Sequence, residues 1–143
     1  MKNLLIIFSV MLIFVSACQQ SGSNQDKTGE VYDNVILVYN FHLTNRCPSC
    51  IAIEDATTKT LNTYFSEELK EGKIKQFIIN VDESANSKIA EKYEAYGSGL
   101  RITKIENGKE QTIDLTAEGF KYARSKEDQF IEILKSKIDE FLK

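Results

Sequence analysis

The sequence predicts a single α/β domain whose mixed four-stranded sheet is covered by helices, with elements in the order β-α-β-α-β-β-α. Three observations support this fold class. Two β-prone apolar runs, residues 35–41 and 74–81, flank a segment with helical spacing, which is the pattern of a parallel strand pair joined by a helical crossover. The dipeptide Asn-Gly at 107–108 predicts an antiparallel hairpin, and an amphipathic helix closes the chain.

The first half of the domain supplies the parallel strands. Residues 35–41 read Val-Ile-Leu-Val-Tyr-Asn-Phe, a continuous run that is typical of a central strand. A helix is expected over residues 48–69, with Gly72 as its stop. The second strand is expected over residues 74–81. We therefore expect a right-handed β-α-β unit in this half.

The second half begins with a short helix that ends at Gly97, and four residues lie on its apolar face: Ile89, Ala90, Tyr93 and Tyr96. Residues 100–106 and 109–115 alternate apolar and polar side chains, which predicts neighbouring antiparallel strands. The last helix is expected from about Lys126, with Ser125 and Asp128 as a capping pair. Its apolar stripe is a core face formed by Phe130, Leu134, Ile138 and Phe141.

A Cys-Pro-Ser-Cys motif lies where the first strand has ended and the first helix begins. If Cys47 is the N-cap residue, Pro48 takes the first helical position, where a missing N–H costs nothing. The Cys47 sulfur then faces the N–H groups of Ser49 and Cys50. These donors, the helix dipole and Arg46 are expected to hold the Cys47 pKa below the value of about 8.5 for a free thiol.

This asymmetry assigns different roles to the two cysteines. Cys47 is the expected nucleophile, whereas Cys50 packs deeper, stays a thiol and resolves the mixed disulfide. Two nearby side chains are candidates for proton transfer. His42 lies five residues before Cys47, and Glu54 lies one turn beyond Cys50. The alternative is that His42 is an ordinary hydrogen-bonded loop residue and that Glu54 is a solvated surface residue.

The N-terminus reads as an export signal. Lys2 supplies positive charge, residues 4–15 form an apolar run, and small residues precede Cys18. The run is too short for a membrane-spanning helix, which needs about 20 residues. The sequence Val-Ser-Ala-Cys at 15–18 resembles the lipobox of bacterial lipoproteins, and this resemblance implies that residues 1–17 are removed and that Cys18 is acylated.

Residues 18–31 are polar and read as a flexible tether between Cys18 and a domain at 32–143. We therefore expect a protein of the cell envelope, lipid-anchored to a membrane and facing outside the cytoplasm, where disulfides persist. The 18 basic and 21 acidic residues give a net charge of −3, which argues against nucleic acid as a partner. A monomer is the expected state.

The motif, its position after the first strand and the order of elements together resemble the thioredoxin family, over about Val35 to Lys143. The pairs Phe41-His42, Arg46-Cys47 and Ile53-Glu54, with Cys50, are similar to a branch of small bacterial thioredoxin-like proteins. The resemblance implies an exposed nucleophile at Cys47, a buried partner at Cys50 and no cofactor. It also implies an exported protein or a small disulfide as substrate, in envelope thiol reduction or cytochrome c maturation.

Three features depart from the family pattern. Asn45-Arg46 stand in place of the tryptophan before the first cysteine. The family's cis-proline has no counterpart, and a trans backbone is expected at its place near residues 98–100. The buried acid of the first strand is absent, since Tyr39 and Phe41 stand there. A weaker or narrower activity is the natural inference.

Two other uses of the cysteine pair stay open. One is an inert structural disulfide in a thioredoxin-fold binding module, which the missing proline favours. The other is a Cu(I) or Zn(II) site built from Cys47, Cys50 and His42, although a closed zinc site needs four ligands. The main expectation is a thiol–disulfide oxidoreductase that holds no metal.

Overall fold

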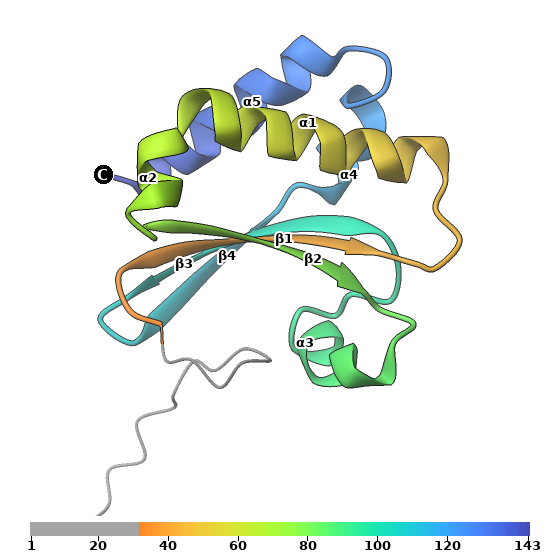
Figure 1. Cartoon of the computed structure of the whole chain (residues 1–143), viewed down its shortest axis with the longest axis horizontal. Coiled ribbons are helices and arrows are strands. Elements are labelled where there is room, and N and C mark those ends of the chain that lie inside the picture. The colour runs from red at the N-terminus through yellow and green to blue at the C-terminus, as the bar shows by residue number, and fades with distance from the viewer. Residues whose placement is uncertain (1–31) are drawn as a thin grey trace, which may run out of the picture.

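Four strands form one mixed sheet in the computed structural model, which describes residues 32–143 (Figure 1). The spatial order is β2-β1-β3-β4, and the strands are β1 (Val35–His42), β2 (Ile74–Asn80), β3 (Gly99–Glu106) and β4 (Lys109–Asp114). β1 and β2 are parallel, whereas β3 is antiparallel to both β1 and β4. The predicted mixed four-stranded α/β sheet is thus confirmed. The signal peptide, Cys18 and the tether lie outside the described residues.

Helices cover both faces of the sheet (Figure 1). One face carries α1 (Pro48–Tyr64), α2 (Ser66–Lys70), α4 (Thr116–Tyr122) and α5 (Glu127–Phe141). The opposite face carries the short helix α3 (Ser87–Lys92), preceded by a 3-10 turn over Ser84–Asn86. Among residues 32–143, no helix combines the length and apolar character needed to cross a bilayer.

The alternation of side chains along β1 divides the core into two clusters. The cluster under α1 and α5 includes Ile36, Val38, Ile53, Leu100, Phe130, Leu134 and Ile138. The cluster under α3 includes Tyr32, Leu37, Tyr39, Phe41, Ile79 and Tyr93. Because β1 is buried on both faces, its sequence is almost continuously apolar. The predicted apolar stripe of the last helix is confirmed as core packing.

The single helix predicted over residues 48–69 is wrong, because two helices occupy this segment. α1 ends at Tyr64. The C-cap residue Phe65 leaves the helical region with φ −132°, and its N–H donates to the carbonyl of Leu61 at 3.0 Å. The Phe65 side chain is 3 % exposed. Burial of this ring accompanies the break between α1 and α2, an effect of packing that helical spacing does not show.

The hairpin prediction is confirmed. Asn107 and Gly108 have φ values of 52° and 70°, as a two-residue turn between right-twisted strands requires. The register places Glu106 opposite Lys109 and Ile102 opposite Ile113.

Three other expectations are corrected. The helix α3 ends at Lys92, so Tyr96 is not on its apolar face and is 82 % exposed. A seven-residue helix, α4, follows β4 where none was predicted. The N-cap of α5 is Lys126 and makes no side-chain cap, so the expected pair of Ser125 and Asp128 does not form a capping box.

Candidate functional site

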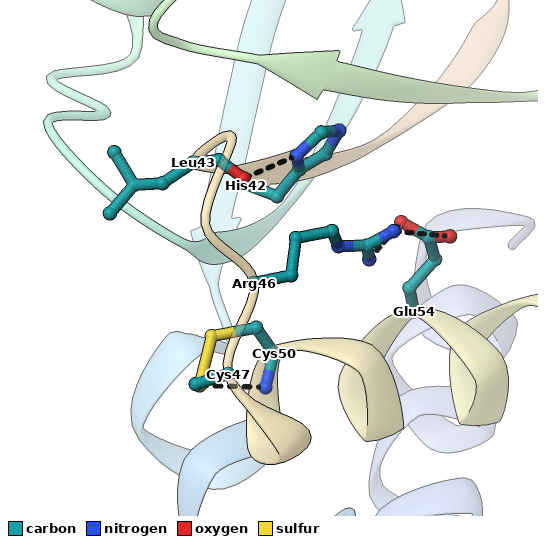
Figure 2. Close-up of a disulfide and its surroundings, with 6 residues drawn as sticks. All are labelled: His42, Leu43, Arg46, Cys47, Cys50 and Glu54. Atoms are coloured by element: carbon teal, nitrogen blue, oxygen red, sulfur yellow. Dashed lines mark hydrogen bonds and ion pairs between the residues drawn. A yellow bond between two sulfur atoms is a disulfide. The ribbon is translucent and has the colours of Figure 1, made fainter.

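The Cys-Pro-Ser-Cys segment forms the first turn of α1, directly after the loop that leaves β1. Cys47 is the N-cap residue in an extended conformation, and Pro48 opens the helix. Its sulfur is joined to that of Cys50 in a disulfide (Figure 2). The backbone N–H of Cys50 donates to the Cys47 sulfur at 3.1 Å. Of the two hydrogen bonds expected at the Cys47 sulfur, the one from the Cys50 N–H is therefore present. The one from the Ser49 N–H does not form in the described structure.

The two cysteines differ in exposure. Cys47 is exposed, and Cys50 is half-buried. This difference follows from their positions, since the N-cap residue projects beyond the helix while a residue one turn later lies against the neighbouring strands. Cys47 is therefore the more accessible of the two cysteines.

Arg46 and Glu54 form an ion pair beside the disulfide. The Arg46 Nη2 atom lies 2.6 Å from Glu54 Oε2, and the second guanidinium nitrogen lies 3.4 Å from Oε1. The side chains are 26 % and 17 % exposed. Figure 2 shows the Arg46 side chain turned along α1 toward Glu54 rather than toward the sulfur atoms. The guanidinium is consequently paired with a carboxylate one helical turn beyond Cys50. Its Nε atom is buried and has no hydrogen-bond partner among residues 32–143.

A narrow cleft lies between the start of α1 and the adjoining ends of β1 and β3. It has no room for a water molecule in this oxidised form. Its lining comprises Asn40, Phe41, Arg46, Cys50, Ile53, Glu54, Ser98 and Gly99. The cleft therefore brings together the inner cysteine, the candidate proton acceptor Glu54 and the segment that includes Ser98 and Gly99.

Asn40 is the site residue that sequence reasoning missed. It is 3 % exposed, lines the cleft with Cys50 and accepts a hydrogen bond from Gln76 Nε2 at 2.9 Å. The same nitrogen donates to Thr58 at 2.9 Å. The available signal was a lone polar residue in an apolar strand. Its two neighbours Tyr39 and Phe41, the residues found where a buried acid was sought, point to the opposite face of the sheet.

His42 is at the end of β1, and its ring faces its own loop. Nδ1 lies 3.0 Å from the carbonyl oxygen of Leu43, and Figure 2 shows the ring directed away from the disulfide. Within residues 32–143, no three or more His, Cys, Asp or Glu side chains gather as a potential metal site. The alternative of a metal held by Cys47, Cys50 and His42 therefore gains no support from the geometry.

The loop between β1 and α1 is fixed by the segment that follows β2. The backbone N–H of Thr44 donates to Asp82 Oδ2 at 2.7 Å. This hydrogen bond, followed by one from the Thr44 hydroxyl, lowers the Asp82 pKa from its ordinary value. Asn80 Nδ2 also donates to the Thr44 hydroxyl at 3.2 Å. These contacts hold the chain in place just before Cys47.

The peptide bonds at residues 98–100 are trans, as expected, and residues 32–143 contain no cis peptide bond. Gly99 pairs with Phe41, and the N–H of Leu100 donates to the Thr116 hydroxyl at 3.1 Å. A Cβ added to Gly99 would lie 2.7 Å from that hydroxyl oxygen. The glycine thus permits the close approach of α4 to this wall of the cleft.

Comparison with known proteins does not define a family. No family model matches the chain, and no curated protein matches it. A solved structure described as that of a malarial protein is 15 % identical, with a TM-score of 0.42. The match covers 70 % of this chain and 97 % of that one.

Proposed function

We propose that the protein is a thiol–disulfide oxidoreductase, with Cys47 as the nucleophile and Cys50 as the resolving thiol. The observation that carries this proposal is the hydrogen bond from the Cys50 N–H to the exposed Cys47 sulfur at the start of α1. A donor and the positive end of a helix dipole stabilise the thiolate form of a cysteine. A buried structural disulfide would need neither the exposure nor the donor.

The reaction exchanges one disulfide for another. The Cys47 thiolate attacks a substrate sulfur, forms a mixed disulfide and expels a substrate thiolate, which takes up a proton. Cys50 then loses its proton and attacks the Cys47 sulfur. The second substrate thiol leaves, so the substrate gains two electrons and the protein is left with the Cys47–Cys50 disulfide. The same steps in reverse oxidise a dithiol.

Glu54 is the proposed acceptor of the Cys50 proton. Residues four apart on a helix share a face, and both side chains line the same cleft. Arg46 holds the Glu54 carboxylate in place through the 2.6 Å ion pair. The proposed proton path does not include His42, because its ring faces the Leu43 carbonyl.

The proposed fold family is that of thioredoxin. The strand order β2-β1-β3-β4, with β1 and β2 parallel and the disulfide at the β1–α1 junction, supports this assignment. Export and lipid attachment at Cys18 are part of the proposal, and their support is the N-terminal sequence alone. The proposed setting is the outer surface of a membrane, where another exported protein or a small disulfide is the substrate.

Trapping of the mixed disulfide tests these roles. With Cys50→Ser, the reduced protein should attack a disulfide-bonded model protein such as insulin and remain covalently attached to it through Cys47. With Cys47→Ser, the adduct should fall at least tenfold, since Cys50 is half-buried. Equal yields from the two variants, or no adduct from either, would overturn the assignment. Glu54→Gln should slow the release of the second substrate thiol without slowing the first attack.

A further inference from the structure

The outer edge of β2 is unpaired in the part of the chain that the structure describes. β2 is an edge strand of the sheet and pairs only with β1, so half of its backbone groups face away from the sheet. An open edge of this kind is a template for another strand. The other edge strand, β4, is protected differently, because its sequence Lys-Glu-Gln-Thr-Ile-Asp is mostly charged or polar.

The hydrogen bonds to β1 identify which groups face outward. The Ile36 N–H donates to the Lys73 carbonyl at 2.8 Å, and the Val81 N–H donates to the His42 carbonyl at 2.9 Å. In a parallel ladder, alternate residues direct both backbone groups to the same neighbour. The odd-numbered residues of β2 therefore face β1. The residues whose backbone groups face outward are Ile74, Gln76, Ile78 and Asn80. The Asn80 carbonyl is already occupied, because it accepts from Asn86 Nδ2 at 2.7 Å and from the Glu83 N–H at 3.3 Å.

Ile78 makes this edge apolar at its middle. The side chain is 51 % exposed, although it lies in a strand between Phe77 and the buried Ile79. It is on the sheet face that carries α1, because Phe77 and Ile79 belong to the cluster on the opposite face. If another strand paired with this edge, it would cover the exposed Ile78 side chain and bond to the outward N–H and C=O groups of the same residue.

We propose that β2 pairs antiparallel with β2 of a second copy, with Ile78 on the two-fold axis. In this register, the Ile78 backbone groups of the two copies bond to each other and the two exposed side chains meet. Gln76 of each copy lies opposite Asn80 of the other. The eight strands then form one continuous sheet, with the α1 helices on the same side.

Charge along the strand favours a second copy as the occupant. The segment begins with Lys73 and Lys75 and is followed by Asp82 and Glu83. Antiparallel pairing places the basic start of one copy beside the acidic end of the other, twice in each dimer. A parallel arrangement would oppose like charges. The proposed dimer replaces the expectation of a monomer. It is independent of the cysteine chemistry, because Cys47 and Cys50 lie at the start of α1 and not on the outer edge of β2.

Photo-crosslinking from the edge tests the pairing in the full 143-residue chain. A diazirine amino acid is placed at position 78 in cells that express the protein, and the same probe at Gln111 on β4 is the matched control. We expect a covalent dimer from position 78, at least tenfold above the control, with the crosslink mapped to residues 76–80 of the second copy. Crosslinks to residues 1–31 of the same chain, to a different protein, or to no protein would overturn the proposal.

A charge at the edge provides a second measurement. Native mass spectrometry of the detergent-solubilised full chain should show dimers for the unmodified protein and at least a tenfold lower dimer fraction for Ile78→Lys. Gln111→Lys should leave the dimer unchanged. Because the Ile78 side chain is half-exposed, the variant should keep the circular dichroism spectrum of the parent. A folded Ile78→Lys variant that dimerises like the parent would contradict the β2 interface.

Discussion

Gly119 lies where α4 meets the helix that carries the cysteines. A Cβ added at this position would lie 3.0 Å from both Cγ1 and Cδ1 of Ile53 and 3.3 Å from its Cγ2. Ile53 is 3 % exposed and is part of the core under α1, so it has little freedom to move away. We therefore expect Gly119→Ala to destabilise the protein, although alanine is the better helix former.

Two opposing contributions set the magnitude. Replacing glycine by alanine inside a helix stabilises by about 1 kcal/mol. Overpacking a core typically costs about 1–3 kcal/mol. The expected net loss is about 1 kcal/mol, which lowers the melting temperature of a domain of this size by about 4 °C. Gly97→Ala is the matched control, because no atom of residues 32–143 outside its immediate chain neighbours lies within 4 Å of a Cβ added there.

The sign of the effect should reverse when Ile53 is truncated. All three nearest atoms to the added Cβ belong to Ile53, so Ile53→Ala removes the clash. In that background, Gly119→Ala should stabilise by about 1 kcal/mol, giving a coupling of about 2 kcal/mol in a double-mutant cycle. Urea denaturation of the four proteins measures this coupling. Additive effects would refute the close packing of α4 on α1.

Three further predictions concern single residues, namely Asn40, Asp82 and Asn107. Asn40→Leu should cost about 1–2 kcal/mol in urea denaturation, because the Gln76 amide loses a buried acceptor; an unchanged midpoint would contradict this role. The Asp82 pKa is lowered chiefly by the hydrogen bond from the Thr44 N–H. The Asp82 carboxylate therefore stabilises the folded protein above the ordinary Asp pKa of about 3.9, and this stabilisation is lost as the pH falls through the lower folded-state pKa. Melting curves should therefore show Asp82→Asn less stable than the parent at pH 7, with a gap that closes in acid rather than staying constant. Asn107→Val should cost about 1–2 kcal/mol in thermal unfolding, because a β-branched residue is strained at φ 52°; a neutral effect would argue against the turn.

The elements that the sequence predicts well are those with short-range signals. The hairpin follows from Asn107-Gly108, whose turn needs positive φ at both positions. The burial of β1 follows from its continuous apolar run, and the placement of Cys47 at the helix start follows from Pro48. Each of these features is encoded within a few neighbouring residues.

The elements that the sequence does not reveal depend on contacts between distant segments. α4 contains a glycine, its N-cap residue Leu115 makes no side-chain cap, and in the structure it packs against Ile53. The break at Phe65 coincides with burial of its ring. The cleft needs the register of β1 with β3 to bring Gly99 opposite Phe41. Asn40 becomes a site residue only when its side chain is known to face α1.

The midpoint potential of the Cys47–Cys50 couple tests the proposed function most directly. The protein is equilibrated against glutathione buffers, trapped by alkylation and analysed by mass spectrometry. We expect a value between about −120 and −270 mV, the range of working oxidoreductases, with Cys47 alkylated before Cys50 at mildly acidic pH. A potential below about −300 mV, with neither thiol unusually acidic, would contradict the proposal and indicate a structural disulfide.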